Sequence, residues 1–331
     1  MRIAISRLAI GMALGGALLA ASVAPSMTAE PYTIVTVVKL IGVNWFSRMD
    51  EGIKKFGADT GNHSSMIGPP TADAALQVQE IEDLIAKKVS AIAVVPNSPE
   101  AMEPVLKKAM SRGIVTIGHE GASLKNVDYD IEAFDNAAYG EHLMQALAKG
   151  MGEEGKYAVF VGHLTAKSHN EWVDGAIAYQ KAHYPKMELV ADRIESNEDQ
   201  QQAYARTKEL LRAHPDLKGI EGSAATDVAG AGLAIQEAGL GGKITVVGTS
   251  LPSVSGKLID SGAITMISFW DPALAGYAMN KVAVDKLAGK PVADGEDLGV
   301  TGYNKIALKG HVIYGQAWVD VTKDNMKDYP F

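Results

Sequence analysis

The chain has 331 residues and a formal net charge of −8, and it contains no cysteine. A chain of this length forms one large domain or two lobes of ordinary size. The acidic balance disfavours nucleic acid and anionic membrane surfaces as partners, and the lack of cysteine excludes disulfides, thiol catalysis and thiolate metal sites.

The first residues predict export. Arg2 and Arg7 form a short basic start, and an apolar run rich in Ala, Leu and Gly follows over Leu8–Val23. This run is shorter than the roughly 20 residues that a membrane-spanning helix needs, and the pattern is typical of a secretory signal peptide. We expect removal of residues 1–29, with cleavage after Ala24 as the alternative. The loss of the two arginines leaves a mature chain of net charge −10.

After this leader, short apolar runs rich in β-branched residues alternate with amphipathic segments. The runs predict buried parallel strands, and the segments between them have the apolar spacing of helices. Strict alternation of this kind predicts right-handed crossovers and doubly wound sheets. The expected strands are Tyr32–Val38, Ala91–Val95, Ile114–Ile117, Tyr157–Val161, Gly219–Gly222, Ile244–Val247 and Ile264–Phe269.

The alternation continues beyond the usual size of one sheet, so we expect an α/β fold with two Rossmann-like lobes. Ligands of open parallel sheets bind beyond the carboxyl ends of the strands. The loops that follow the expected strands therefore hold the candidate site residues. These residues fall into two sets, one before about Asp135 and one after it.

The loop after the first expected strand contains a cation, an amide and two aromatic rings, namely Lys39, Asn44, Trp45 and Phe46. This mixture suits a sugar, because the apolar face of a sugar stacks on an aromatic ring while its hydroxyls need partners that donate and accept hydrogen bonds. Packing in the core of the sheet is the alternative role for the two rings, and for Phe46 this alternative is nearly as strong as a place in the cleft.

The loops of the second half contain further polar candidates. Ser168, His169 and Asn170 lie at the start of an expected helix, so they either face a cleft or cap the helix. Asp227 lies near another helix N-terminus, where a carboxylate either caps the helix or accepts hydrogen bonds from ligand hydroxyls. Asp271, directly before a proline, has the same two alternatives.

Several motifs, in their order and spacing, carry a resemblance to a known family. They are Val-Lys-Leu-Ile-Gly-Val-Asn-Trp-Phe from Val38, Ile-Gly-Pro-Pro-Thr from Ile67, Ala-Ile-Ala-Val-Val-Pro-Asn-Ser-Pro from Ala91, His-Asn-Glu-Trp from His169, and Thr-Ser-Leu-Pro followed later by Phe-Trp-Asp-Pro. Over nearly all of the mature chain, the sequence resembles the type I periplasmic sugar-binding proteins of ABC transporters. Within this family it is similar to the branch that includes rhamnose-binding and autoinducer-2-binding proteins.

The resemblance implies the periplasmic binding protein type I fold, in which two lobes are joined by a hinge of three crossings. The N-terminal lobe is expected to comprise residues 30–135 plus 271–301, and the C-terminal lobe residues 136–270 plus 302–331. The crossings are expected near Phe134–Asn136, Trp270–Asp271 and Val300–Tyr303.

The resemblance also implies which residues contact the ligand. They are Lys39, Asn44 and Trp45 from the first lobe, Ser168, His169, Asn170 and Asp227 from the second, and Trp270 or Asp271 at the hinge. Where relatives usually have Trp-Asp-Ser, this chain has Gly118-His119-Glu120, so Glu120 is expected to replace the missing carboxylate. Ser168-His169 stands where autoinducer-2 binders have Asp-Gln. Both departures disfavour autoinducer-2 as the ligand.

The expected function is that of the periplasmic solute-binding component of an ABC importer, which binds a sugar or sugar-like polyol between the lobes. We expect a monomer without enzymatic activity or cofactor, whose partners are the permease and its ATPase. An autoinducer-2-type signal-binding protein, or a partner that presents ligand to a chemoreceptor or sensor, is the alternative. A secreted hydrolase needs two carboxylates across a cleft, for which Glu120 and Asp227 are the candidate pair. A metal bound by His119, Glu120, His163 and His169 is a weaker alternative.

Overall fold

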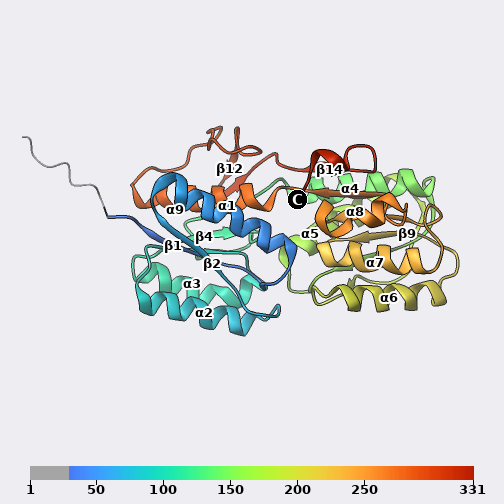
Figure 1. Cartoon of the computed structure of the whole chain (residues 1–331), viewed down its shortest axis with the longest axis horizontal. Coiled ribbons are helices and arrows are strands. Elements are labelled where there is room, and N and C mark those ends of the chain that lie inside the picture. Colours follow the sequence, from blue (N-terminus) through green and yellow to red (C-terminus); the bar gives the residue numbers. More distant parts are fainter. Residues whose placement is uncertain (1–29) are drawn as a thin grey trace, which may run out of the picture. The chain divides into compact units, whose positions relative to one another are not determined.

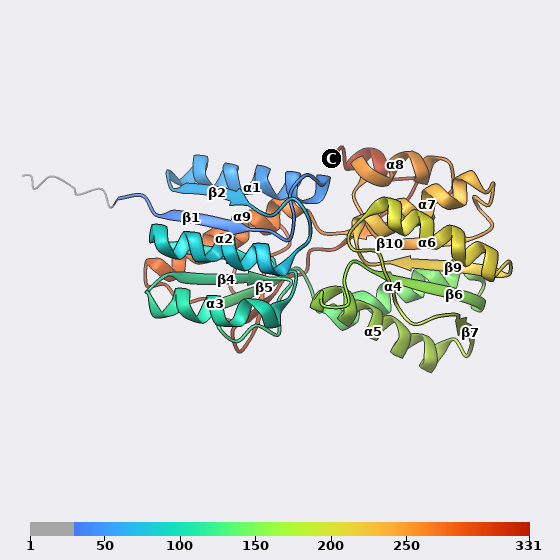
Figure 2. The same ribbon diagram turned by 90° about the horizontal axis from the view of Figure 1, so that it is seen from below.

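The computed structural model describes residues 30–331, and the expected signal peptide lies outside this range. Residues 31–331 form one compact unit that contains two sheets of seven strands each. Helices cover both faces of each sheet, which gives two α/β lobes (Figures 1 and 2). No helix of the described range combines the length and apolar character needed to cross a membrane.

The first lobe contains a sheet with the strand order β12-β13-β5-β4-β3-β1-β2. All neighbours are parallel except β12 and β13. Helices α1 and α9 lie on one face, and α2 and α3 on the other (Figure 1). The bounds are β1 Thr33–Val37, α1 Asn44–Thr60, β2 His63–Ile67, α2 Ala74–Lys87, β3 Ala91–Val94, α3 Pro99–Ser111, β4 Val115–His119, β5 Tyr129–Glu132, α9 Pro272–Leu287, β12 Ala307–Lys309 and β13 Val312–Tyr314.

The second lobe contains a sheet with the strand order β14-β11-β10-β9-β6-β7, and β8 also pairs with β6. Only β14 runs antiparallel to its neighbour. Helices α4 and α5 pack together, as do α6, α7 and α8 (Figure 2). The bounds are α4 Asn136–Met151, β6 Glu154–Val161, α5 Lys167–His183, β7 Lys186–Leu189, β8 Ile194–Glu195, α6 Gln200–Ala213, β9 Leu217–Gly222, α7 Ala225–Glu237, β10 Thr245–Thr249, α8 Pro252–Asp260, β11 Met266–Phe269, β14 Val319–Val321 and the short 3₁₀ helix η1 Met326–Asp328.

The expectation of two α/β lobes with mostly parallel sheets is confirmed. Each of the seven expected strands is present, with ends that differ by at most a few residues. The strands that the sequence analysis missed are short or polar. One example is β2, whose sequence His-Ser-Ser-Met-Ile is partly exposed at the edge of the first sheet. An edge strand buries little surface, so its sequence lacks the continuous apolar run of a central strand.

The chain passes between the two sheets three times. It leaves the first sheet after β5 and enters α4, and it returns between β11 and α9. The third passage lies between β13 and β14, whereas the sequence analysis expected it at Val300–Tyr303. The assignment of all of residues 302–331 to the C-terminal lobe is therefore wrong. The reason is that Val312–Tyr314 pairs in parallel with Asp130–Glu132 and extends the first sheet.

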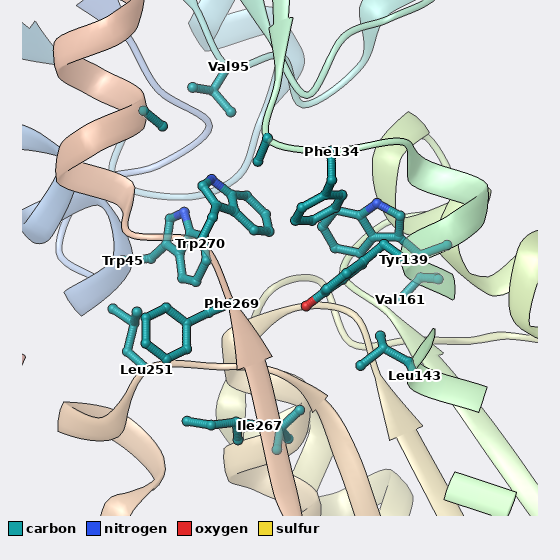
Figure 3. Packing of buried hydrophobic residues seen from close by; sticks show 14 of the residues in the cluster. Trp45, Val95, Phe134, Tyr139, Leu143, Val161, Leu251, Ile267, Phe269 and Trp270 are labelled. Atoms are coloured by element: carbon teal, nitrogen blue, oxygen red, sulfur yellow. The ribbon is translucent and has the colours of Figure 1, made fainter. Parts of the chain in front are cut away.

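Buried apolar side chains form two clusters. The smaller one lies in the first lobe between the sheet and helices α2 and α3. The larger one runs without a break from α1 and α9 into the second lobe, through aromatic side chains at the crossings. In this aromatic group, Phe134 stacks on Tyr139 with ring centroids 4.1 Å apart, and Trp270 meets Phe134 edge-on at 5.2 Å (Figure 3). The crossings are thus packed as a core and not as loose linkers.

One buried charge-bearing side chain in the second sheet has no partner. Glu221 lies on the central strand β9, is 0% exposed, and neither carboxylate oxygen has a hydrogen-bond partner among the described residues. Burial raises the pKa of Glu221 to about 8, because the charged form is penalised in an apolar environment. At neutral pH this side chain is a neutral acid within the core.

We expect Glu221→Gln to change how stability depends on pH. Between about pH 4.5 and pH 8, unfolded Glu221 releases its proton while the folded protein retains it. The free energy of unfolding therefore falls as pH rises, by up to about 1.4 kcal/mol per pH unit. Because glutamine does not titrate, the stability of the variant relative to the native protein should rise steadily over this range. Urea unfolding from pH 5 to pH 8 measures the difference.

Glu188→Gln, the same change at an exposed residue of β7, is the matched control for the loss of a glutamate side chain from this sheet, and the difference is measured for both variants over the same pH range. A constant difference for Glu221→Gln would contradict a raised pKa of Glu221.

Candidate functional site

A cavity of about 580 Å³ lies where the carboxyl ends of the strands of both sheets meet. The first lobe contributes the loops after β1, β2 and β4, and the second contributes the loops before α6 and after β9 and β10. The residues that line the cavity are Lys39, Leu40, Ile41, Gly42, Val43, Asn44, Trp45, Phe46, Pro70, Thr71, Ala72, Glu120, His169, Trp172, Asn197, Glu198, Asp199, Gln200, Ser223, Ala224, Ala225, Thr226, Thr249, Val254 and Trp270.

The cavity contains a buried ion pair. Lys39, at the end of β1, is 3% exposed, and Glu120, directly after β4, is 5% exposed. The Lys39 Nζ donates to Glu120 Oε2 at 2.8 Å and also lies 3.5 Å from Glu198 Oε1. Glu120 has a positive φ of 57°, which is a strained conformation for a side chain of this kind. Such strain is concentrated at functional sites.

Both members of this pair stay ionised at neutral pH. Burial by itself lowers the pKa of the Lys39 ammonium, but the negative charges of Glu120 and Glu198 outweigh it, so the pKa of Lys39 lies above its ordinary value. Burial likewise opposes the ionisation of Glu120, but the positive charge of Lys39 lowers the pKa of Glu120 to about 2. The cavity therefore presents one fixed cation and at least one fixed anion.

Two histidines next to this pair are neutral. Burial and then the positive charge of Lys39 lower the pKa of His169 to about 4, and its Nδ1 accepts from the Gly162 backbone N–H at 3.2 Å. Burial also lowers the pKa of His119. The His119 Nδ1 lies 2.5 Å from the Ile131 carbonyl oxygen and its Nε2 accepts from Trp270 Nε1 at 3.3 Å. This geometry assigns the proton of His119 to Nδ1.

Aromatic rings form one wall of the cavity. Trp45, in the first turn of α1, meets Trp270 edge-on with ring centroids 4.7 Å apart (Figure 3). They are 8% and 1% exposed, so they belong to the core and line the cavity at the same time. The sequence analysis treated core packing and cleft lining as alternatives for Trp45 and Phe46, whereas both positions combine them.

Of the side chains proposed from the sequence, seven line the cavity, namely Lys39, Asn44, Trp45, Phe46, Glu120, His169 and Trp270. Asn44 is exposed at its rim, and its Nδ2 lies 3.4 Å from Ser253 Oγ on α8 of the other lobe. The remaining five do not line it, and each has a role in supporting the structure around it.

Two of these five contact the cavity residues from behind. The Ser168 Oγ donates to Glu120 Oε2 at 3.2 Å and so links α5 of the second lobe to the first. His119 supports Trp270, as described above. Ser168 and His119 thus lie next to residues that line the cavity but do not line it themselves.

The other three stabilise helix ends and loops. Asp271 caps α9 by accepting from the Ala273 backbone N–H and also pairs with Arg48 through two hydrogen bonds of 2.9 and 2.7 Å. Asn170 lies within the first turn of α5 and donates to the carbonyl oxygens of residues 163, 164 and 166. The Asp227 Oδ2 accepts from the Ala224 backbone N–H at 2.8 Å at the start of α7. In this structure these side chains have the capping or loop-supporting roles that were the alternatives to ligand contact.

The sequence analysis missed the polar loop before α6, which contributes Asn197, Glu198 and Asp199 to the cavity. It follows β8, a strand of only two residues, which the apolar pattern did not reveal. The signal available in the sequence was the run Ser-Asn-Glu-Asp before an amphipathic helix. Among residues 30–331 there is no group of three or more His, Asp or Glu side chains placed to hold a metal ion.

Two parallel-sheet lobes with a polar and aromatic cavity at their strand ends define a protein that binds a small molecule in a cleft. The comparisons agree with this class. Residues 34–291 match the model of the periplasmic binding protein domain, and the chain belongs to this family. It is accordingly a solute-binding protein and not an enzyme.

The chain is 27% identical over 270 residues to the D-allose-binding periplasmic protein of Escherichia coli, an alignment that covers 78% of this chain and 85% of that protein. A solute-binding protein of Clostridium phytofermentas solved with L-rhamnose superposes with a TM-score of 0.82 at 23% identity, over 90% of this chain and 98% of that one. LsrB of Clostridium saccharobutylicum, solved with AI-2, gives a TM-score of 0.83 at 22% identity, over 90% and 100%. The last two likenesses show the fold.

We expect Asp227→Ala to lower stability without changing ligand affinity. The substitution removes the hydrogen bond that the Ala224 backbone N–H donates to Asp227 Oδ2, and a hydrogen bond of this kind contributes about 0.5–1.5 kcal/mol. Asp73→Ala, which removes the cap of α2 in the first lobe, is the matched control. Thermal unfolding and calorimetric titration of both variants measure the two effects. Affinity at least tenfold weaker in Asp227→Ala alone would instead place Asp227 in the ligand site.

Proposed function

We propose that this chain is the periplasmic solute-binding component of an ABC importer, that it binds a sugar or sugar-like polyol in the cavity between its lobes, and that it delivers this ligand to the permease as a monomer. The observation that carries the proposal is the buried Lys39–Glu120 ion pair on the wall of a cavity that also contains Trp45 and Trp270. A volume of about 580 Å³ lies within the range of roughly 300–1,000 Å³ for small-molecule sites.

The chemistry of the cavity matches a polyhydroxylated ligand. A hydroxyl group both donates and accepts hydrogen bonds, so it is satisfied by an ammonium on one side and a carboxylate on the other. Lys39 and Glu120 offer this combination at 2.8 Å from each other. The indole rings supply the apolar surface on which the C–H face of a sugar packs. The curated D-allose-binding relative supports the same ligand class.

The permease can distinguish the ligand-bound protein from the empty protein only if the arrangement of the two lobes changes when ligand binds. Polar contacts between the lobes include Ser168 Oγ with Glu120 Oε2 and Thr165 Oγ1 with the Asn97 carbonyl oxygen. A ligand that contacts both walls adds to these contacts and favours the closed arrangement of the lobes. The permease is then expected to recognise the closed form.

A thermal-shift screen tests the ligand class. We expect at least one neutral pentose, hexose, 6-deoxyhexose or polyol to raise the melting temperature, because a ligand that binds only the folded state adds about 2.7 kcal/mol at a concentration of 100 times its Kd. Autoinducer-2 belongs in the same screen, and a response to it alone would favour the signal-binding alternative.

The matched control is the double variant Lys39→Met, Glu120→Gln, which removes both charges. The variant leaves neither Lys39 nor Glu120 as an unpaired buried charge, but Glu198 loses its contact of 3.5 Å with Lys39, so the melting temperature without ligand is measured first to show that the variant folds. The folded variant should show no response to the sugar. A sugar response of the double variant equal to that of the native protein would contradict this site. Small-angle scattering with the same sugar should show a smaller radius of gyration for the native protein.

Export is tested separately. Mass spectrometry of the protein from the periplasmic fraction should find its N-terminus at Glu30, or at Pro25 for the alternative cleavage site. An intact Met1 on membrane-embedded protein would contradict a cleaved signal peptide. A variant with Arg2 and Arg7 replaced by Glu should accumulate uncleaved, since the basic start is part of the export signal.

A further inference from the structure

Glu198 holds a constrained position in the cavity. It lies in the loop between β8 and α6 and is 11% exposed. Glu198 and its neighbour Asn197 both have positive φ values, of 54° and 57°. Asparagine adopts this region comparatively easily, whereas for glutamate it is uncommon and is held by the surrounding structure. Gly162 provides the space for Glu198, because a Cβ there would lie 2.7 Å from the Glu198 Cγ. The local backbone therefore directs this carboxylate to the cavity.

Three polar atoms on the second-lobe wall have no hydrogen-bond partner among the described residues. They are Glu198 Oε1, Ser223 Oγ and Thr226 Oγ1, and all three residues line the cavity. Ser223 is 1% exposed, so solvent does not replace the missing partner. Buried polar atoms without partners are destabilising, and a ligand that donates hydrogen bonds to this wall removes that cost.

The buried charges of the cavity do not balance. Lys39 is the cation, whereas Glu120 and Glu198 are two carboxylates around it, at 2.8 and 3.5 Å. His169 adds no positive charge at neutral pH, since burial holds its pKa at about 4. Glu120 takes the direct hydrogen bond from Lys39, so the charge of Glu198 is the one left over. In a site of low dielectric constant an unbalanced charge acts strongly on a bound group.

We propose that Glu198 makes the cleft selective for charge, accepting hydrogen bonds from the hydroxyls of a neutral sugar or polyol and excluding the same molecule when it carries a carboxylate. This inference rests on the proposed function and narrows its ligand class. An ionised carboxylate only accepts hydrogen bonds, so it pairs with hydroxyl donors, and a second carboxylate beside it gains no bond and is repelled.

Matched pairs of neutral and acidic sugars test this selectivity. The probes are D-glucose with D-glucuronate and D-galactose with D-galacturonate, two pairs in which the sugar ring is kept, titrated calorimetrically at pH 7. In the native protein we expect the neutral member of a pair to bind at least tenfold more tightly than its acid. In Glu198→Gln, which has nearly the same shape without the charge, affinity for the neutral sugar should fall about tenfold. The ratio of neutral to acidic affinity should also shrink at least tenfold.

Two further variants make the outcome specific. Glu188→Gln removes the same charge from the same lobe at an exposed position and should leave the ratio unchanged. Glu198→Asp keeps the charge and should keep the exclusion of the acid, and the melting temperature without ligand shows whether each variant is folded. Two outcomes would overturn the role of Glu198 and leave the proposed function intact. They are a native protein that binds the acidic member as tightly as the neutral one, and a ratio of neutral to acidic affinity that is unaltered in folded Glu198→Gln. If the native protein binds no member of the pairs and no sugar of the wider screen, the proposed function itself fails.

Discussion

The ion pair between Lys39 and Glu120 is the interaction on which the cavity depends. Removing two charges from water costs several kcal/mol per ion, and the attraction between them repays this cost only when the geometry is good and further hydrogen bonds complete it. Here the Nζ to Oε2 distance is 2.8 Å, and Ser168 of the other lobe adds a hydrogen bond to the same oxygen. The pair therefore links the ends of two strands of the first sheet to α5 of the second lobe. It also keeps a positive and a negative charge fixed at buried positions in the cavity.

The aromatic residues at the crossings complement this polar centre. Phe134, Tyr139, Trp172 and Trp270 pack on one another edge-to-face or stacked, and Figure 3 shows three of them, Phe134, Tyr139 and Trp270, side by side. Tyr139 also donates through its hydroxyl to the Ser268 carbonyl oxygen at 2.8 Å. Such pairs add to the stability that their buried area supplies. Trp270 belongs to this group and also lines the cavity. The segment that joins the lobes is therefore part of the cavity wall.

The sequence predicted a cavity-lining residue correctly where a single strand and the loop after it were enough to identify it. Lys39, Trp45 and Glu120 were found because each lies in the segment that follows a continuous apolar strand, and the carboxyl ends of parallel strands meet at one edge of a sheet. It failed for Glu198, since β8 before it has only two residues, and for β13, whose pairing partner β5 is distant in the sequence. The role of a carboxylate at a helix N-terminus could not be decided from the sequence in any case. A carboxylate there satisfies backbone N–H groups or a ligand equally well, and only its direction in space distinguishes the two.

The sequence by itself determined the α/β class, the two lobes and most of the loops that surround the cavity, because the periodicity of apolar residues and the order of strands and helices are local properties that the chain carries along its length. Which side chains of those loops reach the cavity was decided only by the tertiary structure. Asp227 and Asp271 turn to backbone N–H groups, whereas Glu198 is directed inward by two positive φ angles and by the space at Gly162. These directions depend on contacts between segments far apart in the chain. No local pattern encodes them.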